Sequence, residues 1–170
     1  MRRLVDLEIL VLDCQATGAE PSNGRLLEIG WAKTSASNET IPLCCVESHL
    51  VRWPEEAEMP RRVHRVTGIE VDDLRSPSAL PPAEIWTFLT RTAGEVTKVD
   101  QCQSCPAVIH FSRFEEPYLR HLHKDLAPGS SFPFDIICTH EIVRRLLPEL
   151  PRRGLRAIAG YFGHTVPELR

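Results

Sequence analysis

The chain has 170 residues, of which 42% are hydrophobic and 25% are charged, and its formal net charge at pH 7 is −3. This length predicts one compact domain over residues 1–170, and the absence of an apolar run of about 18 residues argues against a membrane span. The slightly acidic balance argues against a protein that holds long nucleic acid through a general positive field.

The start of the chain and the cysteines predict a cytoplasmic protein with reduced thiols. The basic first residues are followed closely by Asp6 and Glu8, which interrupt the apolar region that a secretory signal needs. Four of the six cysteines lie in apolar, strand-like runs, where a reduced cysteine behaves as a small hydrophobic residue. We therefore expect buried thiols, not disulfides, at Cys14, Cys44, Cys45 and Cys138.

The first two predicted strands form a hairpin with acidic chemistry at its mouth. Residues 9–12 are apolar and rich in branched side chains, which is typical of a buried strand, and they deliver Asp13 and Gln15 to the strand end. Residues 19–25 contain Pro, Ser, Asn and Gly and predict a turn, after which residues 26–34 predict a second strand. The hairpin therefore holds a carboxylate on a stiff support.

Residues 13–18 (Asp-Cys-Gln-Ala-Thr-Gly) and 28–30 (Glu-Ile-Gly) resemble the first motif of the DEDD family of 3′–5′ exonucleases, which includes DnaQ-like proofreading domains and RNase T. The family motif begins Asp-x-Glu, so the neutral amide of Gln15 stands where the family has its second metal-binding carboxylate. The resemblance implies catalytic and metal-binding roles for Asp13 and Gln15. Taken alone, an aspartate at a strand end is also typical of a turn cap. Substrate contacts are implied for Thr17 and Gly18.

The next segment predicts a third strand and a short basic helix. Residues 41–52 alternate loosely and predict a strand antiparallel to the second, and residues 61–67 predict a helix closed by glycine. His64-Arg65-Val66-Thr67 resembles the His-x-x-Thr segment of the family, which implies that His64 and Thr67 lie beside the substrate end. The neighbouring arginines would then pair with phosphate; these are Arg61, Arg62 and Arg65. A helix whose basic side chains are simply solvated explains the arginines equally well.

A second point of resemblance follows a buried strand predicted at residues 106–109. Residues 110–115 (His-Phe-Ser-Arg-Phe-Glu) resemble the second family motif, His-Asn-x-x-Phe-Asp, with Phe in place of Asn and Glu115 in place of Asp. Phe114 opens a series of core-facing residues at helical spacing, so Glu115 lies in the first turn of a helix and points toward Asp13. The resemblance implies that Glu115 is catalytic and binds metal, and that His110 and Phe114 contact substrate.

The remaining elements are predicted from periodicity and punctuation. A helix over residues 82–93 begins at a proline and is followed by an irregular stretch over 94–104. Residues 132–137 predict a fifth strand, and helices are predicted over 139–147 and 155–162.

The third family motif, His-x-x-x-x-Asp on a final helix, is not found before Arg170. His164 has no following aspartate at that spacing, so we do not assign it the role of general base. An alternative metal site is a zinc centre in which a Cys-x-x-Cys pair is joined by two residues from beyond the fifth strand: Cys102, Cys105, Cys138 and His140.

These observations predict a ribonuclease H-like α/β fold with a five-stranded mixed sheet. Strands one to three are antiparallel, strands four and five run parallel to the first, and helices cover both faces. The resemblance implies a 3′–5′ exonuclease that uses Mg²⁺ or Mn²⁺ at a two-ion site to hydrolyse phosphodiester bonds at the 3′ end of single-stranded DNA or RNA. The alternative is a catalytically impaired exonuclease-fold module that binds nucleic acid or a protein partner, on its own or within a larger polypeptide.

Overall fold

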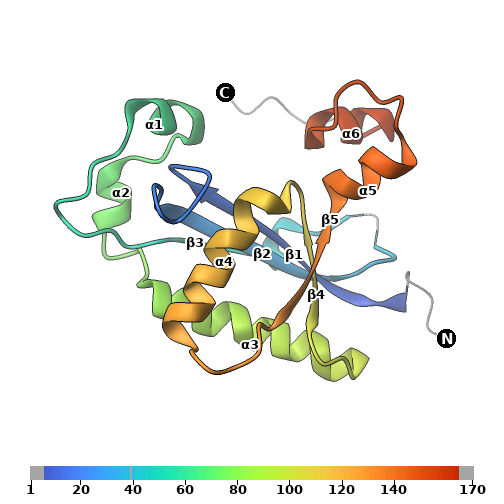
Figure 1. Ribbon diagram of the computed structural model, residues 1–170, viewed down its shortest axis with the longest axis horizontal. Coiled ribbons are helices and arrows are strands. Elements are labelled where there is room, and N and C mark those ends of the chain that lie inside the picture. Colours follow the sequence, from blue (N-terminus) through green and yellow to red (C-terminus); the bar gives the residue numbers. More distant parts are fainter. Residues whose placement is uncertain (1–5, 39, 165–170) are drawn as a thin grey trace.

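A five-stranded mixed sheet runs through the centre of the computed structural model, which describes residues 6–38 and 40–164 (Figure 1). Its strand order is β3-β2-β1-β4-β5. The first three strands pair antiparallel, whereas β4 pairs parallel to β1 and β5 parallel to β4. The predicted fold class and strand directions are therefore confirmed. The strands are β1 (Glu8–Ala16), β2 (Leu26–Ser35), β3 (Val46–Leu50), β4 (Cys105–Ile109) and β5 (Phe134–Cys138).

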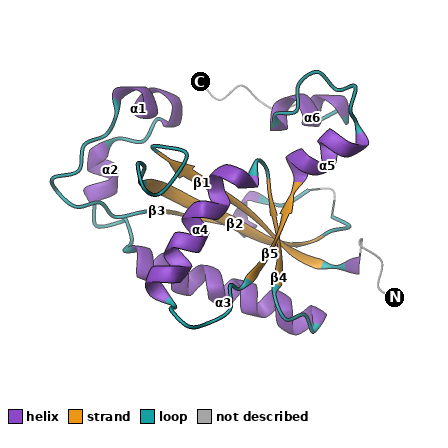
Figure 2. Cartoon of the chain, in the orientation of Figure 1, coloured by secondary structure: helices purple, strands orange, loops and turns teal. Residues whose placement is uncertain are grey.

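Two long helices, α3 and α4, pack against the sheet and against each other. Four shorter helices lie in two pairs beyond the strands, with α1 and α2 after β3, and α5 and α6 after β5 (Figures 1 and 2). None of the helices in the described ranges has the length and hydrophobicity of a membrane-spanning helix. The helices are α1 (Arg61–Thr67), α2 (Val71–Arg75), α3 (Pro82–Asp100), α4 (Ser112–Leu126), α5 (Thr139–Leu146) and α6 (Leu155–Tyr161).

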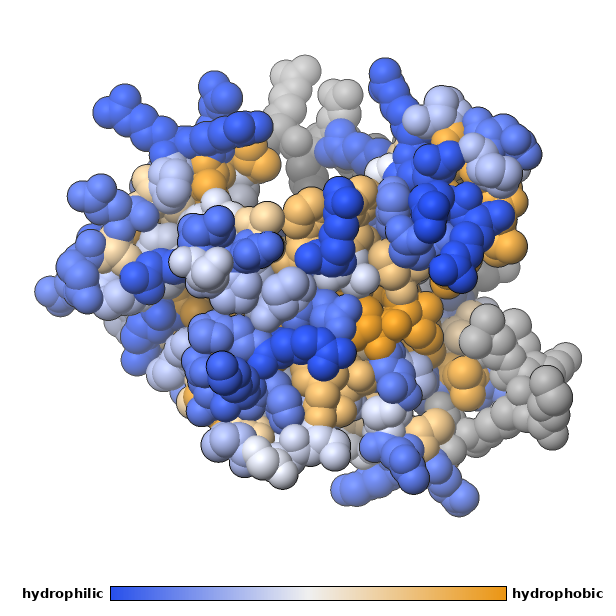
Figure 3. All heavy atoms as spheres, in the orientation of Figure 1, coloured by the Kyte–Doolittle hydropathy of each residue, from blue (hydrophilic) through white to orange (hydrophobic). Residues whose placement is uncertain are grey.

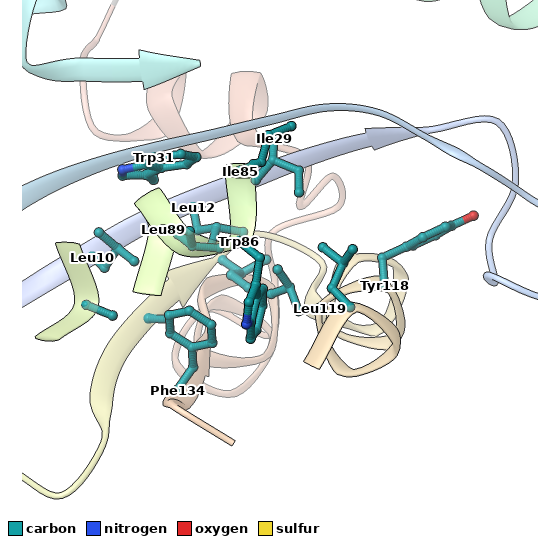
Figure 4. Packing of buried hydrophobic residues seen from close by; sticks show 14 of the residues in the cluster. Leu10, Leu12, Ile29, Trp31, Ile85, Trp86, Leu89, Tyr118, Leu119 and Phe134 are labelled. Atoms are coloured by element: carbon teal, nitrogen blue, oxygen red, sulfur yellow. The ribbon is translucent and has the colours of Figure 1, made fainter. Parts of the chain in front are cut away.

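The main core lies between the sheet and these two long helices (Figure 4). Alternate residues of β1, Leu10 and Leu12, point toward α3, where Ile85 and Leu89 are fully buried. Each such aliphatic side chain contributes about 1.5–3 kcal/mol through burial. The alternation leaves the intervening β1 residues on the opposite face of the sheet. Hydrophilic side chains cover most of the face shown in Figure 3, around a hydrophobic area at its centre.

Helix α3 continues seven residues beyond the end predicted at residue 93. A glycine inside a helix costs about 1 kcal/mol relative to alanine, which suggested that the helix stops near Gly94. Val96, two residues later, is fully buried in the main core, and its burial offsets that cost. The helix ends instead at Asp100, and the residue that caps it, Gln101, adopts a left-handed conformation with φ of 53°.

The third strand is shorter than predicted, and two cysteines expected to be buried are exposed. Pairing with β2 begins only at Val46, and residues Leu43–Cys45 form a turn of 3-10 helix before it. Cys44 and Cys45 lie in that turn and both are exposed, so the prediction of buried thiols is wrong for both. Cys14 and Cys138 are partly buried, and neither of them forms a disulfide.

Candidate active site

Strands β1 and β2 place three oxygen-bearing side chains on the sheet face opposite the main core. Asp13 is paired with Gly30 and Gln15 with Glu28, so Asp13, Gln15 and Glu28 share that face. They line a pocket of about 270 Å³, in which the hydroxyl of Ser48 on β3 donates a hydrogen bond to Glu28. Strand β1 reaches Ala16, so Asp13 and Gln15 lie within the strand and not just beyond it.

Glu115 approaches Asp13 from the first turn of α4. Its side chain is 7% exposed, and its Oε2 accepts a hydrogen bond of 3.1 Å from the backbone N–H of Cys14. The β1–β4 pairing ends at Val11 and Val108, so the N–H of Cys14 lies beyond that ladder and reaches α4. The residue after Asp13 thus fixes the position of the Glu115 carboxyl group.

The acids of this region influence one another's ionisation. Burial, and then the negative charge of Asp13, raise the pKa of Glu115 to about 8, although the hydrogen bond from the N–H of Cys14 opposes both effects. Part of the Asp13 side chain is exposed, yet partial burial and then the charge of Glu28 raise the pKa of Asp13 above its ordinary value. In the described ranges, no lysine, arginine or histidine forms an ion pair with Asp13, Glu28 or Glu115. The site therefore favours a proton or a bound cation.

The donor set suits a hard divalent cation with an open coordination shell. Carboxylate and amide oxygens are ligands of Mg²⁺ and Mn²⁺, and Mg²⁺ is often held by one or two carboxylates together with water and substrate phosphate. Among residues 6–38 and 40–164, no three His, Cys, Asp or Glu side chains converge closely enough to hold a metal ion. Asp13 and Glu115 would therefore share such an ion with the Gln15 amide, water or substrate.

Glu115 also lines a separate groove of about 330 Å³ between the β1–β2 loop and the start of α4. This groove brings Thr17, Gly18 and Phe114 together with Glu115. Phe111 and Tyr118, to which the sequence had assigned no functional role, form the rest of its α4 wall. Asp13 and Gln15 line the pocket described above and not this groove.

The β1–β2 loop that forms one wall of the groove is fixed by hydrogen bonds. The N–H of Thr17 donates to the carbonyl of Arg25, and the N–H of Arg25 donates to the hydroxyl of Thr17, each at 2.9 Å. The Tyr118 hydroxyl donates to the carbonyl of Gly18 at 2.8 Å (its side chain extends from the core in Figure 4). A Cβ atom at Gly24 would clash with that hydroxyl and lie 2.8 Å from the Gly18 nitrogen. Glycine is therefore required at position 24.

His110 lies outside the groove and supports it. Its Nδ1 is 2.9 Å from the hydroxyl of Thr139, and its ring packs against His140 and Phe111. Partial burial, and then proximity to His140, lower the pKa of His110. The histidine thus joins the end of β4 to the start of α5 behind Phe111.

His64 and Thr67 are placed at the end of α1, where their side chains bond the backbone. The Nδ1 of His64 is 3.1 Å from the carbonyl of Ile69, and the Thr67 hydroxyl donates to Val63 at 3.0 Å and accepts the N–H of Ile69 at 3.2 Å. Neither residue lines the Asp13 pocket or the Glu115 groove. The structure therefore does not bring them together with the acids.

The alternative zinc site is not formed. In the parallel pairing of β4 and β5, Cys105 lies opposite Phe134 and Cys138 opposite Ile109, so the two cysteines are at opposite ends of the pair. His140 packs against Phe111 with ring centroids 3.9 Å apart. No metal-binding group of three such residues exists within the described ranges.

Comparison with known proteins gives the same fold. Escherichia coli Exonuclease I in complex with a 5cy-dA13 oligonucleotide matches with a TM-score of 0.71 and 14% identity over 94% of this chain and 36% of that chain. A zinc-bound form of an E. coli Exonuclease I–single-stranded DNA complex matches with a TM-score of 0.72 and 14% identity over 95% of this chain and 36% of that chain. Exonuclease I from Methylocaldum szegediense matches with a TM-score of 0.69 and 15% identity over 95% of this chain and 36% of that chain.

The chain thus spans little more than a third of the length of these solved structures. No curated protein matches the sequence significantly. The family model for the RNase T exonucleases matches residues 10–167 and includes both acidic motifs. The chain therefore belongs to the RNase T exonuclease family.

Proposed function

We propose that this domain is a metal-dependent 3′–5′ exonuclease that acts on the end of single-stranded DNA or RNA and releases nucleoside monophosphates. The observation that carries the proposal is the approach of Glu115 to Asp13 across the end of the β1–β4 pairing, with no basic side chain of the described residues to neutralise them. Family membership and the single-stranded DNA held by the similar Exonuclease I structures support it.

The proposal assigns each acid a task. Asp13 is partly exposed and offers a carboxylate to Mg²⁺ or Mn²⁺ at the pocket surface, whereas Glu115 is buried and holds a proton until a cation is present. The carbonyl oxygen of Gln15 is a weaker, neutral donor beside Asp13. Divalent ions at such a site activate water and offset charge on the phosphoryl oxygens.

The groove beside Glu115 is proposed to receive the strand end. Thr17 and Gly18 hold one wall in a single conformation, and Phe114 forms the other. A preformed groove lowers the cost of ordering a flexible strand end on binding. His110 supports this wall from behind, and His64 and Thr67 act by stabilising the end of α1.

A non-catalytic module that binds nucleic acid or a protein partner is the second candidate. The observation that favours it is the neutral Gln15, which leaves the pocket one carboxylate short of the family motif. Such a module would bind a strand end in the same groove without cleaving it.

A labelled-strand assay separates the two candidates. Single strands labelled at the 3′ or the 5′ end are incubated with Mn²⁺ or Mg²⁺, and released mononucleotides are measured. We expect release from the 3′ end by the native protein and its loss in Asp13→Ala and Glu115→Gln, while Glu116→Gln, a change at the neighbouring α4 residue, retains it. Equal background from native protein and Asp13→Ala would refute catalysis at this site.

A further inference from the structure

Cys44 and Cys45 form an exposed pair of adjacent thiols just before β3. Both lie in the turn of 3-10 helix over Leu43–Cys45, and their Sγ atoms are 4.0 Å apart. Both side chains are exposed, whereas cysteine is among the residue types most often buried in proteins. The two thiols therefore do not pack the core, and they line neither the Asp13 pocket nor the Glu115 groove.

Adjacent cysteines are poorly placed to form a disulfide with each other. The Cα atoms of neighbouring residues are about 3.8 Å apart across a trans peptide bond, whereas those of a disulfide usually lie about 4.4–6.8 Å apart. A bond between the two sulfurs would be strained, and strained disulfides are readily reduced. We therefore expect the pair to persist as two thiols that a soft metal ion can reach.

The spacing of the two sulfurs suits one metal ion between them. A zinc–sulfur bond is about 2.3 Å long, so two sulfurs that share an ion of similar size lie at most about 4.6 Å apart. The observed 4.0 Å is within this limit, and rotation of two exposed side chains can adjust it. Thiolates are soft ligands, which select monovalent copper, zinc or an iron–sulfur cluster.

The number of protein ligands distinguishes these three candidates. Structural zinc takes four protein ligands, and iron–sulfur clusters are held by four side chains, most often cysteines. Among the residues that the structure describes, no three His, Cys, Asp or Glu side chains form a group that could hold a metal ion, so the pair gains no third ligand of this kind. Monovalent copper is the soft ion that two thiolates alone can satisfy.

We propose that Cys44 and Cys45 bind one monovalent copper ion through both sulfur atoms. Each thiol loses its proton as its copper–sulfur bond forms, so two protons leave and one positive charge enters. Because the ligands are sulfurs, Mg²⁺ and Mn²⁺ should not compete for this site, and copper should not displace them from the oxygen ligands around Asp13. The copper site does not depend on the proposed exonuclease activity.

The test is a competition titration of the full chain with monovalent copper under argon. Ascorbate keeps the ion reduced, and bicinchoninate is the competitor whose coloured copper complex reports the copper that the protein has not bound. Cys44→Ser and Cys45→Ser each remove one sulfur from an exposed position, so both variants should stay folded, which circular dichroism checks. Cys102→Ser is the matched control, because Cys102 is the third exposed cysteine and lies elsewhere in the chain.

We expect the native protein to bind one copper ion, and Cys44→Ser and Cys45→Ser each to bind it about 100-fold more weakly or worse. The reason is that a second thiolate on the same chain acts at a high effective concentration. The Cys102→Ser control should bind as the native protein does, and X-ray absorption at the copper edge should report two sulfur ligands. Native affinity in either variant of the pair, or an equal loss in Cys102→Ser, would overturn the inference.

Other uses of the two thiols would give different results. A disulfide between them that survives excess reduced glutathione, detected by peptide mass spectrometry, would overturn the inference. A dimer that forms on addition of Zn²⁺ and is lost in Cys44→Ser, detected by analytical ultracentrifugation, would also overturn it, because two copies would then share one ion through four sulfurs.

Failure of this inference and failure of the proposed function are distinguishable through Asp13→Ala. This variant should bind copper as the native protein does, whether or not the native protein cleaves a strand. Copper binding without any hydrolysis would refute only the exonuclease, and Asp13-dependent hydrolysis without copper binding would refute only the copper site.

Discussion

The ionisation of Glu115 gives a sharp prediction for stability, tested by Glu115→Gln without divalent ions. The pKa of this buried carboxyl group is raised from 4.5 to about 8. Below pH 4.5 it is protonated in both folded and unfolded chains. Between these values the unfolded chain loses the proton and the folded chain keeps it, so the stability of the native protein falls as pH rises and then levels off above pH 8. A glutamine at position 115 carries no titratable proton, so the variant does not lose stability in this way as the pH rises.

The raised pKa of Glu115 sets an upper limit on the difference in unfolding free energy between the native protein and Glu115→Gln. A pKa difference from 4.5 to about 8 corresponds to at most about 5 kcal/mol of unfolding free energy. Water entering the folded site reduces this value, so we expect about 1–3 kcal/mol. The amide oxygen of glutamine can still accept the N–H of Cys14, which preserves the local structure. The variant should therefore match the native protein near pH 5 and exceed its stability near pH 9.

Urea unfolding followed by circular dichroism at pH 5, 7 and 9 measures the difference, with Glu116→Gln as the control. Glu116 is the next residue of α4 and forms a surface ion pair with Arg120, so its loss should change stability by less than about 1 kcal/mol at every pH. A Glu115→Gln advantage that does not grow between pH 5 and pH 9 would refute the reasoning about this site.

Four further substitutions test the metal ligands, the charge near Asp13 and the β1–β2 loop. Gln15→Glu should raise Mn²⁺ affinity by about tenfold or more in calorimetric titration, since affinity follows ligand charge, and an unchanged affinity would remove Gln15 from the donor set. Glu28→Gln should lower the pKa of Asp13, because it removes a repelling charge; an NMR titration that shows no decrease would contradict this coupling. Gly24→Ala should destabilise the fold by about 1–3 kcal/mol, because its Cβ would clash with Tyr118. Gly94→Ala in α3, where a Cβ meets nothing within 4 Å, should instead stabilise the fold by about 0.5–1 kcal/mol. Equal effects of the two substitutions in urea unfolding would contradict the tight packing of the β1–β2 loop.

The sequence predicted the elements whose signals are local. Alternating apolar residues predicted strand β1, and apolar residues at helical spacing predicted α4 with Glu115 in its first turn. The two acidic motifs pointed to Asp13 and Glu115 as site residues, and the structure places these two side chains near each other. The end of α3 was wrong because Gly94 is a local signal, whereas the burial of Val96 depends on the assembled core.

The remaining features of the site depend on contacts between distant residues. Tyr118 and Gly18 are 100 residues apart, and the sequence around either residue does not predict their hydrogen bond. The place of Glu28 opposite Gln15 follows only from the register of the hairpin. The left-handed conformation of Phe111 likewise has no local signal, because a phenylalanine is not expected there.

Cation binding with proton release tests the central claim most directly. Mn²⁺ is titrated calorimetrically at pH 7 in two buffers of different ionisation enthalpy, which gives the number of protons released on binding. If Asp13 and Glu115 share the cation, the native protein should release close to one proton, from Glu115, and Glu115→Gln should release none while Asp13→Asn binds weakly or not at all. Binding without proton release, or binding equally strong in native protein and both variants, would contradict the claim.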